Sequence, residues 1–227
     1  MGEKIHPGKK AAGEKAAAFV ESGMKVGLGT GSTAYWAIRK IGERVAEGLD
    51  IQAVATSVDS ENLARQWHIP LVHFADIDHL DLDIDGADEV DENYQLIKGG
   101  GGALLREKMI ATHSKRMVVV VDNAKLVVRL GQFPLPVEVV PFAIEWSTAA
   151  LKTHCSQLSL RTKNNQPYLT DNGNCILDCH FDRIGDAALL EQTLNQIPGV
   201  VENGLFVGLC DTVVVGYADG HTEILQK

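Results

Sequence analysis

The chain has 227 residues, of which 45% are hydrophobic and 22% are charged, a composition typical of a globular protein that buries a core. Its 30 Asp and Glu residues outnumber its 21 Lys and Arg residues, so the formal net charge is -9. This acidic balance argues against a nucleic acid or a membrane surface as partner, because both require a basic face on the protein. A small anionic ligand would have to be held by a few placed cations.

The cysteines and the N-terminal residues indicate the compartment. None of the cysteines forms a C-x-x-C pair or has a His at zinc-ligand spacing, so we expect neither a disulfide scaffold nor a metal site; they are Cys155, Cys175, Cys179 and Cys210. The first lysines are not followed by the apolar stretch of a signal peptide, and no apolar run approaches the roughly 18 residues of a membrane span. The sequence therefore predicts a cytoplasmic protein with free thiols.

The first part of the chain alternates predicted helices and strands. A helix over residues 9–22 precedes an apolar strand at 24–28. Further helices are expected at 33–47, 59–67 and 103–114, and further strands at 51–55, 70–74, 80–84 and 117–121. Apolar strands separated by helices predict a mostly parallel sheet that is covered on both faces, in a Rossmann-like α/β layout.

After residue 131 the order of the elements changes. Strands are predicted at 137–140, 158–161, 175–181 and 200–206, with helices at 144–154 and 187–197. This β-α-β-β-α-β order is the ferredoxin-like pattern. Two final strands, at 212–217 and 222–225, are expected to return to the first sheet. We thus predict a Rossmann-like domain from residues 1–130 plus 207–227, a smaller ferredoxin-like insertion or lid from 131–206, and a ligand site in the cleft between them.

The first candidate site is the glycine turn Gly27-Leu28-Gly29-Thr30-Gly31-Ser32-Thr33, which matches a dinucleotide fingerprint only in part. A strand followed by glycines and hydroxyls at a helix N-terminus offers backbone N–H groups to an anion, so we interpret it as a phosphate cradle. The alternative is a tight turn in which Ser32 or Thr33 caps the helix.

The acidic segment 81–92 matches the EF-hand pattern D-x-D-x-D-G-x5-E. Its context argues against calcium, because Leu80, Leu82 and Ile84 alternate as a strand does, whereas an EF-hand loop lies between two helices. The other interpretation is that Asp85 and Asp88, beyond the end of a strand, project into the crevice where parallel sheets bind ligands. A solvated acidic turn is the alternative.

A run of four glycines, Gly99 to Gly102, follows Lys98 and precedes a predicted helix. It is either a flexible linker or a loop that lets the backbone approach a ligand closely. In the helix, Leu104, Leu105 and Met109 are expected to pack inward. Glu107 lies about one turn in, where it could act in catalysis or simply favour the helix dipole and pair with Arg106 or Lys108 at the surface.

A fourth segment, 118–125, is a buried strand that ends in Asp122 and is followed three residues later by Lys125. Polar groups thus gather at the carboxyl ends of several predicted strands. Together the segments resemble the ribose-5-phosphate isomerase A family over essentially the whole chain. The resemblance rests on GLGTGST at 27–33, DGADE at 85–89, IKGGGGALLREK at 97–108, VVDNAK at 120–125, FPLPVEVVP at 133–141 and TDNGNCILD at 170–178.

The resemblance implies the roles of individual residues. Substrate would be bound by Lys9, Thr30, Gly31, Ser32, Thr33, Asp85, Gly86, Ala87, Asp88, Lys98, Gly99, Gly100, Gly101, Asp122 and Lys125. Glu107 would move a proton between C2 and C1 of the sugar, Lys98 and loop N–H groups would polarise the developing oxyanion, and Asp85 and Asp88 would serve ring opening or proton shuttling. Lys9, Ser32, Thr33 and Lys125 would hold the phosphate.

The activity that the resemblance implies is the interconversion of D-ribose 5-phosphate and D-ribulose 5-phosphate through an enediolate, in the non-oxidative pentose phosphate pathway. With lysine as the electrophile, this chemistry requires no metal and no cofactor. Relatives form homodimers or tetramers, so a homodimer or a tetramer is expected. Two other functions stay open: a non-enzymatic sugar-phosphate sensor, and an acyl- or CoA-type transferase of similar fold that uses Glu107 as its nucleophile.

Overall fold

The computed structural model describes residues 6–227, which form two compact units. The first unit consists of the chain up to Ala87, Arg106–Leu126 and Leu209–Lys227, and the second of Asp88–Leu105 and Val127–Gly208. Contacts thus group residues 88–105 with the second unit, whereas the predicted boundaries group them with the first. The predicted domain division stays a prediction.

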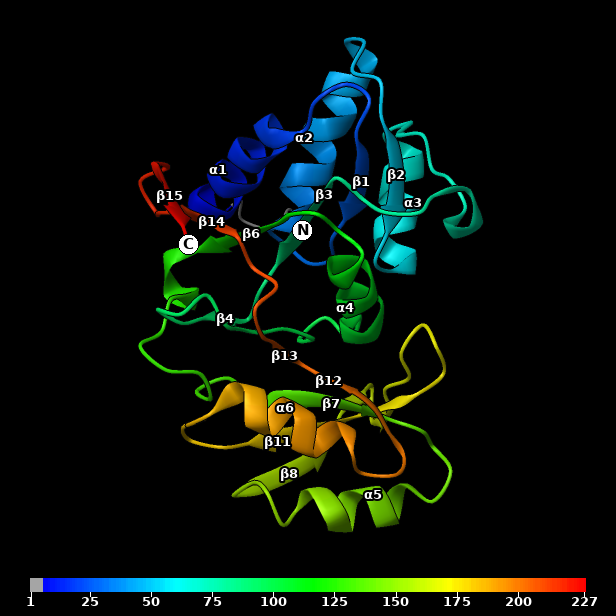
Figure 1. Cartoon of the computed structure of the whole chain (residues 1–227), viewed down its shortest axis with the longest axis vertical. Coiled ribbons are helices and arrows are strands. Elements are labelled where there is room, and N and C mark those ends of the chain that lie inside the picture. Colours follow the sequence, from blue (N-terminus) through cyan, green and yellow to red (C-terminus); the bar gives the residue numbers. More distant parts are fainter. Residues whose placement is uncertain (1–5) are drawn as a thin grey trace. The chain divides into compact units, whose positions relative to one another are not determined.

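The first unit is built on a six-stranded sheet in the order β15-β14-β6-β3-β1-β2 (Figure 1). The strands are β1 Lys25–Leu28, β2 Gln52–Ala55, β3 Leu82–Gly86, β6 Met117–Asp122, β14 Thr212–Gly216 and β15 Thr222–Gln226. All neighbouring pairs are parallel except β14 with β15. The predicted mostly parallel sheet is confirmed. Strand β6 is buried at every position because the sheet is covered on both faces.

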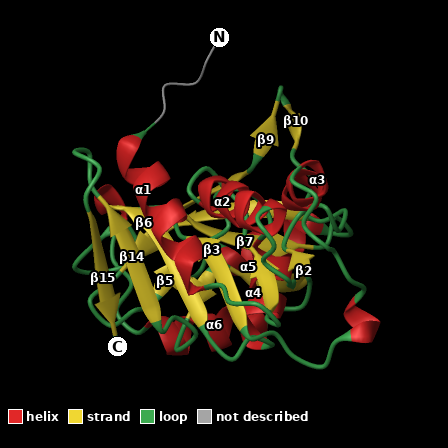
Figure 2. Ribbon diagram, turned by 90° about the horizontal axis from the view of Figure 1, so that it is seen from above, coloured by secondary structure: helices red, strands yellow, loops and turns green. Residues whose placement is uncertain are grey.

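Helices cover this sheet, as Figure 2 shows from above. They are α1 Pro7–Ala16, continued by the 3-10 turn η1 Ala17–Phe19, then α2 Ala34–Ala46, α3 Val58–Gln66 and α4 Leu104–Thr112. Apolar side chains of α1 and α2 pack on one face of the sheet, where Ala12, Ile38 and Ile84 belong to one buried cluster. Ile110 of α4 packs against Val54 and Leu80 on the opposite face.

The second unit contains an antiparallel four-stranded sheet in the order β12-β7-β11-β8. Its elements follow the chain as β7 Leu135–Val139, α5 Ile144–Leu151, β8 Gln157–Leu160, β11 Cys175–His180, α6 Ala187–Asn195 and β12 Val200–Asn203. The predicted β-α-β-β-α-β order and the ferredoxin-like sheet order are both present. Buried Val137, Leu177 and Leu194 belong to the core of this unit.

Two smaller strand groups complete the second unit. A three-stranded sheet joins β4 Glu89–Val90, β5 Leu96–Ile97 and β13 Leu205–Phe206 in the order β13-β5-β4. A short hairpin pairs β9 Thr162–Lys163 with β10 Gln166–Pro167. The hairpin lies beyond β8, and its turn is made by Asn164 and Asn165, both with positive φ.

Two strand predictions are wrong. Residues 70–74 form no strand; they make only an isolated bridge between Leu71 and Ala53, and the chain then turns into the 3-10 helix η2 Phe74–Asp76. The predicted strand 200–206 is two strands in different sheets, because the chain leaves β7 at Asn203 and pairs with β5 from Leu205 onward. The hairpin of β9 and β10 was not predicted.

Candidate active site

The sheet of the first unit brings several predicted site residues to one edge. Strands β1, β3, β6 and β14 are parallel neighbours, so their carboxyl ends lie along the same side of the sheet. Asp85 and Gly86 stand at the end of β3, and Asp122 ends β6. This edge is where parallel α/β sheets bind their ligands.

The turn after β1 is held against the end of β3. The N–H of Gly29 donates to the carbonyl of Ile84 at 2.9 Å, and the N–H of Thr30 donates to Oδ1 of Asp85, also at 2.9 Å. A Cβ on Gly29 would overlap the Asp85 side chain, so only glycine allows this approach. Asp85 is fully buried and also accepts the N–H of Gly86, at 2.7 Å. The carboxylate therefore fixes the path of the predicted phosphate cradle.

A cluster of hydroxyl groups supports the same turn from a different part of the chain. The Thr30 Oγ1 lies 2.7 Å from Oγ1 of Thr56, 2.8 Å from Oγ of Ser57 and 3.1 Å from Oγ of Ser60. Ser60 Oγ donates to the carbonyl of Gly29 at 2.6 Å, and Ser57 accepts the Ser60 N–H as the cap of α3. The turn after β1 and the segment that begins α3 thus meet at Thr30.

Lys9 of α1 reaches this region. Its Nζ donates to Oγ of Ser32 at 3.0 Å and lies 3.9 Å from Oδ2 of Asp122. Thr33 is the N-cap residue of α2, as the alternative interpretation expected, but its side chain makes no capping hydrogen bond. Lys125 lies in the 3-10 turn η3 Asn123–Lys125 that Asp122 caps. Lys9, Ser32 and Asp122 are therefore neighbours, and Lys125 follows Asp122 directly in the next turn.

The acidic segment is not an EF-hand, because it lies on β3 and β4 rather than between two helices. Asp88 follows β3 by two residues, and its Oδ2 accepts the N–H of Gly100 at 2.7 Å. Asp85 and Asp88 therefore hold different loops: Asp85 holds the turn after β1, and Asp88 holds the glycine run. Neither loop is an unattached linker.

Lys98 is buried in the second unit, with 2% of its surface exposed. Its backbone N–H donates to the carbonyl of Gly204 at 2.9 Å, and its Nζ lies 5.3 Å from the centre of the Phe206 ring. Such an ammonium group over an aromatic face is stabilised by the ring quadrupole. A buried lysine is rare outside functional sites, because burial penalises its charge.

Glu107 occupies the first turn of α4 and is also buried, with 4% of its surface exposed. The alternative in which Glu107 pairs at the surface is wrong. Its neighbour Lys108 is buried as well, whereas Met109, expected to pack inward, is 58% exposed. The buried residues of α4 thus include charged side chains beside apolar ones such as Ile110.

Sequence analysis did not identify Glu89, the last residue of the DGADE motif. It is buried, and its carboxylate accepts the N–H groups of Gly131 at 2.7 Å and of Phe133 at 2.5 Å. Burial raises the pKa of Glu89 above its usual range, and the hydrogen bonds from these backbone N–H groups offset only part of that effect. Glu89 thus fixes the segment that leads into β7.

All four cysteines are free thiols, and burial raises the pKa of Cys210 to about 12. Across residues 6–227, no group of three or more His, Cys, Asp or Glu side chains is placed to bind a metal ion. No helix in this same stretch is long and apolar enough to cross a membrane.

The predicted site residues divide between the two units. Lys9, Thr30, Gly31, Ser32, Thr33, Asp85, Gly86, Ala87, Glu107, Asp122 and Lys125 belong to the first unit, and Asp88, Lys98, Gly99, Gly100 and Gly101 to the second. Within the first unit Lys9, Ser32 and Asp122 are brought together, as are Thr30 and Asp85. Within the second, Asp88 joins the glycine run. A single ligand site formed by both sets stays a prediction.

Comparison with known proteins covers nearly the whole chain. The model of the family "Ribose 5-phosphate isomerase A (phosphoriboisomerase A)" matches residues 52–220. A protein named ribose-5-phosphate isomerase A from Ruegeria sp. (strain TM1040) is 52% identical, with 97% of this chain and 87% of the relative covered. One of the same name from Bacillus mycoides (strain KBAB4) is 50% identical, with 95% and 98% covered.

Solved structures agree with these sequence matches. The ribose 5-phosphate isomerase A of Methanocaldococcus jannaschii is 42% identical, with a TM-score of 0.91 over 96% of this chain and 98% of the other. A D-ribose-5-phosphate isomerase in complex with phospho-erythronic acid is 40% identical, with a TM-score of 0.94 over 99% and 100%. Identity at this level over both units leaves one conclusion: the chain belongs to the ribose 5-phosphate isomerase A family.

Proposed function

We propose that the chain is an aldose-ketose isomerase that interconverts D-ribose 5-phosphate and D-ribulose 5-phosphate through an enediolate. The observation that carries this proposal is the match of about half of all residues to isomerases over nearly the full chain. The buried Glu107 and Lys98 support it, because proton abstraction beside a carbonyl needs a base and an electrophile away from bulk water.

Glu107 is the base of the proposed mechanism. It removes the proton from C2 of the open-chain aldose and returns it to C1, while a proton moves from the C2 hydroxyl to the former carbonyl oxygen. The intermediate enediolate carries negative charge on oxygen. Lys98 and the N–H groups of the glycine loop stabilise that charge, which makes the C2 proton more acidic.

The two aspartates differ in burial, which suggests a division of roles. Asp85 is fully buried and engaged with the N–H groups of Thr30 and Gly86, so we assign it to holding the phosphate cradle. Asp88 is half-buried and uses Oδ2 for Gly100, which leaves Oδ1 to exchange protons with sugar hydroxyls during ring opening. The substrate phosphate is assigned to Lys9, Ser32, Thr33 and Lys125.

The relative bound to phospho-erythronic acid bears on the substrate class. That acid carries a phosphate and a carboxylate, and the negative charge of the carboxylate resembles that of an enediolate. We propose that this chain binds the same class of ligand. As the family resemblance implies, we also propose a cytoplasmic homodimer or tetramer.

The decisive experiment is conversion of ribose 5-phosphate in deuterated water. The wild-type chain should form ribulose 5-phosphate that carries deuterium at C1, because the base exchanges its proton with solvent. Glu107→Gln should lower kcat by at least about 10²-fold with a modest change in KM, since general-base catalysis contributes at least that much.

Glu145→Gln is the matched control, because Glu145 occupies the first turn of α5 but is exposed. It should leave kcat unchanged. Phospho-erythronic acid should still bind the Glu107→Gln variant, which would show that its substrate-binding groups are intact. Near-normal turnover by Glu107→Gln would remove Glu107 from the mechanism, and an inactive wild-type chain would remove the proposed function itself.

A further inference from the structure

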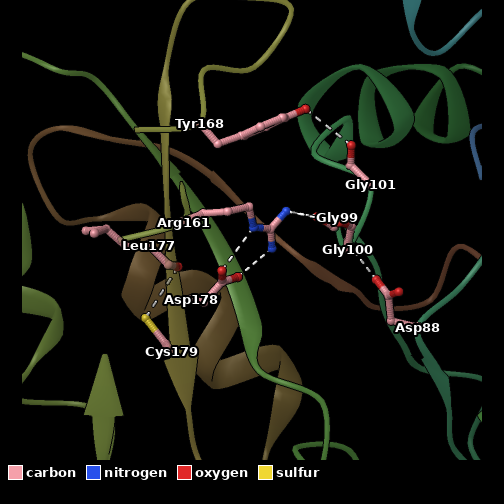
Figure 3. Close-up of polar contacts among 9 residues, drawn as sticks. All are labelled: Asp88, Gly99, Gly100, Gly101, Arg161, Tyr168, Leu177, Asp178 and Cys179. Carbon is pink, nitrogen blue, oxygen red and sulfur yellow. Dashed lines mark hydrogen bonds and ion pairs between the residues drawn. The ribbon is translucent and has the colours of Figure 1, made fainter. Parts of the chain in front are cut away.

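The carbonyl groups of the glycine loop are held by two side chains of the same unit, Arg161, which follows β8, and Tyr168, which follows β10 (Figure 3). Nη1 of Arg161 donates to the carbonyl of Gly99 at 2.7 Å and to that of Gly100 at 3.2 Å. The hydroxyl of Tyr168 lies 3.3 Å from the carbonyl of Gly101. Three consecutive carbonyls therefore point toward one group of donors.

Asp178 of β11 fixes the guanidinium group of Arg161. Nε of Arg161 donates to Oδ2 of Asp178 at 2.9 Å, and Nη2 donates to Oδ1 at 2.5 Å. The side chains are only 15% and 18% exposed. A two-point pairing of this kind sets the plane of the guanidinium group as well as its position. Nη1 is thereby directed at the glycine carbonyls.

Peptide geometry converts this contact into a constraint on the N–H groups. In a trans peptide the carbonyl of one residue and the N–H of the next point in opposite directions. The N–H of Gly100 therefore points away from Arg161, and it is this group that donates to Asp88 at 2.7 Å. By the same geometry, the N–H of Gly101 points away from Arg161.

The backbone of the glycine loop is restricted at Gly102, so its peptides cannot easily rotate to compensate for loss of the Arg161 contact. Gly102 has a φ of +83°, and a Cβ at this position would lie 2.6 Å from Cε1 of Tyr168. Its N–H donates to the carbonyl of Gly99 at 3.0 Å, which closes the turn. The direction of the middle peptides thus depends on the donors to the Gly99 and Gly100 carbonyls.

We propose that Arg161, held by Asp178, is a positioning residue for proton transfer: it aims the N–H group of Gly101 and keeps the N–H group of Gly100 on Asp88. The inference rests on the proposed function, in which loop N–H groups stabilise the enediolate. Arg161 does not touch the substrate in this proposal. Its role is to orient donors before the reaction, and that orientation is what makes an oxyanion site effective.

Arg161→Lys is the first test, because lysine keeps the positive charge but cannot pair with both oxygens of Asp178 and still reach two carbonyls. We expect kcat to fall by about 10- to 100-fold, less than the 10²- to 10³-fold loss of a complete oxyanion donor. KM should change by less than about threefold, since the phosphate contacts stay intact. Arg129→Lys, an exposed arginine in the same unit, is the control and should retain normal kcat.

The primary kinetic isotope effect with C2-deuterated ribose 5-phosphate separates positioning from folding. A less stabilised transition state makes proton transfer more rate-limiting, so the isotope effect on kcat should rise in Arg161→Lys. A smaller folded fraction would lower kcat and leave the isotope effect unchanged. Asp178→Asn should produce the same rise, because it releases the guanidinium group from the other side.

Arg161→Ala with added methylguanidinium completes the test. Rescue of kcat by at least about fivefold, without rescue of the Glu107→Gln variant, is expected. The proposal is overturned if Arg161→Lys has normal kcat, or if its kcat falls with an unchanged isotope effect and Arg161→Ala is not rescued. Both of these outcomes are measured relative to an active wild-type chain. Failure of the proposed function would instead appear as an inactive wild type, so the two failures can be distinguished.

Discussion

Lys9 joins α1 to Ser32, which follows β1, and to Asp122, which ends β6. Lys9→Met should raise KM for ribose 5-phosphate about tenfold or more, because one hydrogen bond to a charged group contributes about 1.5 to 3 kcal/mol. The change should fall on KM rather than kcat, since a phosphate contact acts equally on the substrate and the transition state. Steady-state kinetics measures both constants.

Lys10→Met is the control for this variant, because Lys10 lies next in the same helix and its Nζ is 3.8 Å from Glu14. It should leave KM unchanged. Equal effects of the two substitutions would mean that Lys9 acts through the general charge of α1 and not through contact with the phosphate.

Individual residues could be named as site candidates where they follow a strand or form an ordered motif. The roles of Glu107 and Lys98 are implied by the resemblance and stay predictions; the structure shows that both side chains are buried. Arg161 and Asp178 were missed for a physical reason. Arg161 contacts the carbonyls of Gly99 and Gly100, which lie 62 and 61 residues before it in the sequence. No local sequence pattern encodes so distant a contact. The signal that could have found Asp178 is a charged residue among the buried apolar residues of β11.

At the scale of elements, α3 is coupled to the turn after β1 through the Thr30 hydroxyl cluster. Ser60→Ala removes the donor to the carbonyl of Gly29 and keeps a residue that favours the helix. We expect KM for ribose 5-phosphate to rise about two- to tenfold, the range for one net hydrogen bond of about 0.5 to 1.5 kcal/mol, while kcat changes little. Thr193→Ala is the control, because its hydroxyl only donates back to Leu189 within α6. If both variants behave alike, the cluster does not support the cradle.

The errors at this scale have local causes. Residues 70–74 read as a strand because they are apolar, yet Pro70 has no N–H for a ladder. The segment makes two hydrogen bonds with Ala53 and then leaves the edge of the sheet. The division of residues 200–206 into two strands at Gly204 could not be predicted, because strand periodicity does not identify the partner strand. The hairpin turn Asn164-Asn165, by contrast, had a recognisable signal, since Asn tolerates positive φ.

In α4, the side chains that hydrophobic periodicity predicts to be buried differ from those that are buried in the structure. Periodicity placed Met109 inside, but the buried face holds Glu107 and Lys108. Burying charged side chains costs stability unless their charges are compensated, so hydrophobic periodicity alone does not predict such a face. The overall architecture was predictable because most other elements follow their hydrophobic periodicity.

At the scale of the whole molecule, Glu89 makes stability depend on pH. Its pKa is raised in the folded chain, so the folded state keeps the proton to a higher pH than the unfolded state, whose pKa is near 4.5. The free energy of unfolding should therefore fall as pH rises from about 4.5 through the raised pKa of this group. Urea unfolding between pH 4.5 and pH 7 measures this trend. The free energy of unfolding of the wild type minus that of Glu89→Gln should decrease over this pH range. A constant or increasing difference would contradict the role of Glu89.

The division of the chain into units also bears on its synthesis. The second unit lies between segments of the first, and strands β14 and β15 come after it in sequence. A ribosome therefore completes the second unit before it has made β14, which pairs with β6 in the six-stranded sheet. Until residue 216 emerges, the apolar strand β6 lacks one of its two neighbours, and its unpaired edge needs protection from other nascent chains.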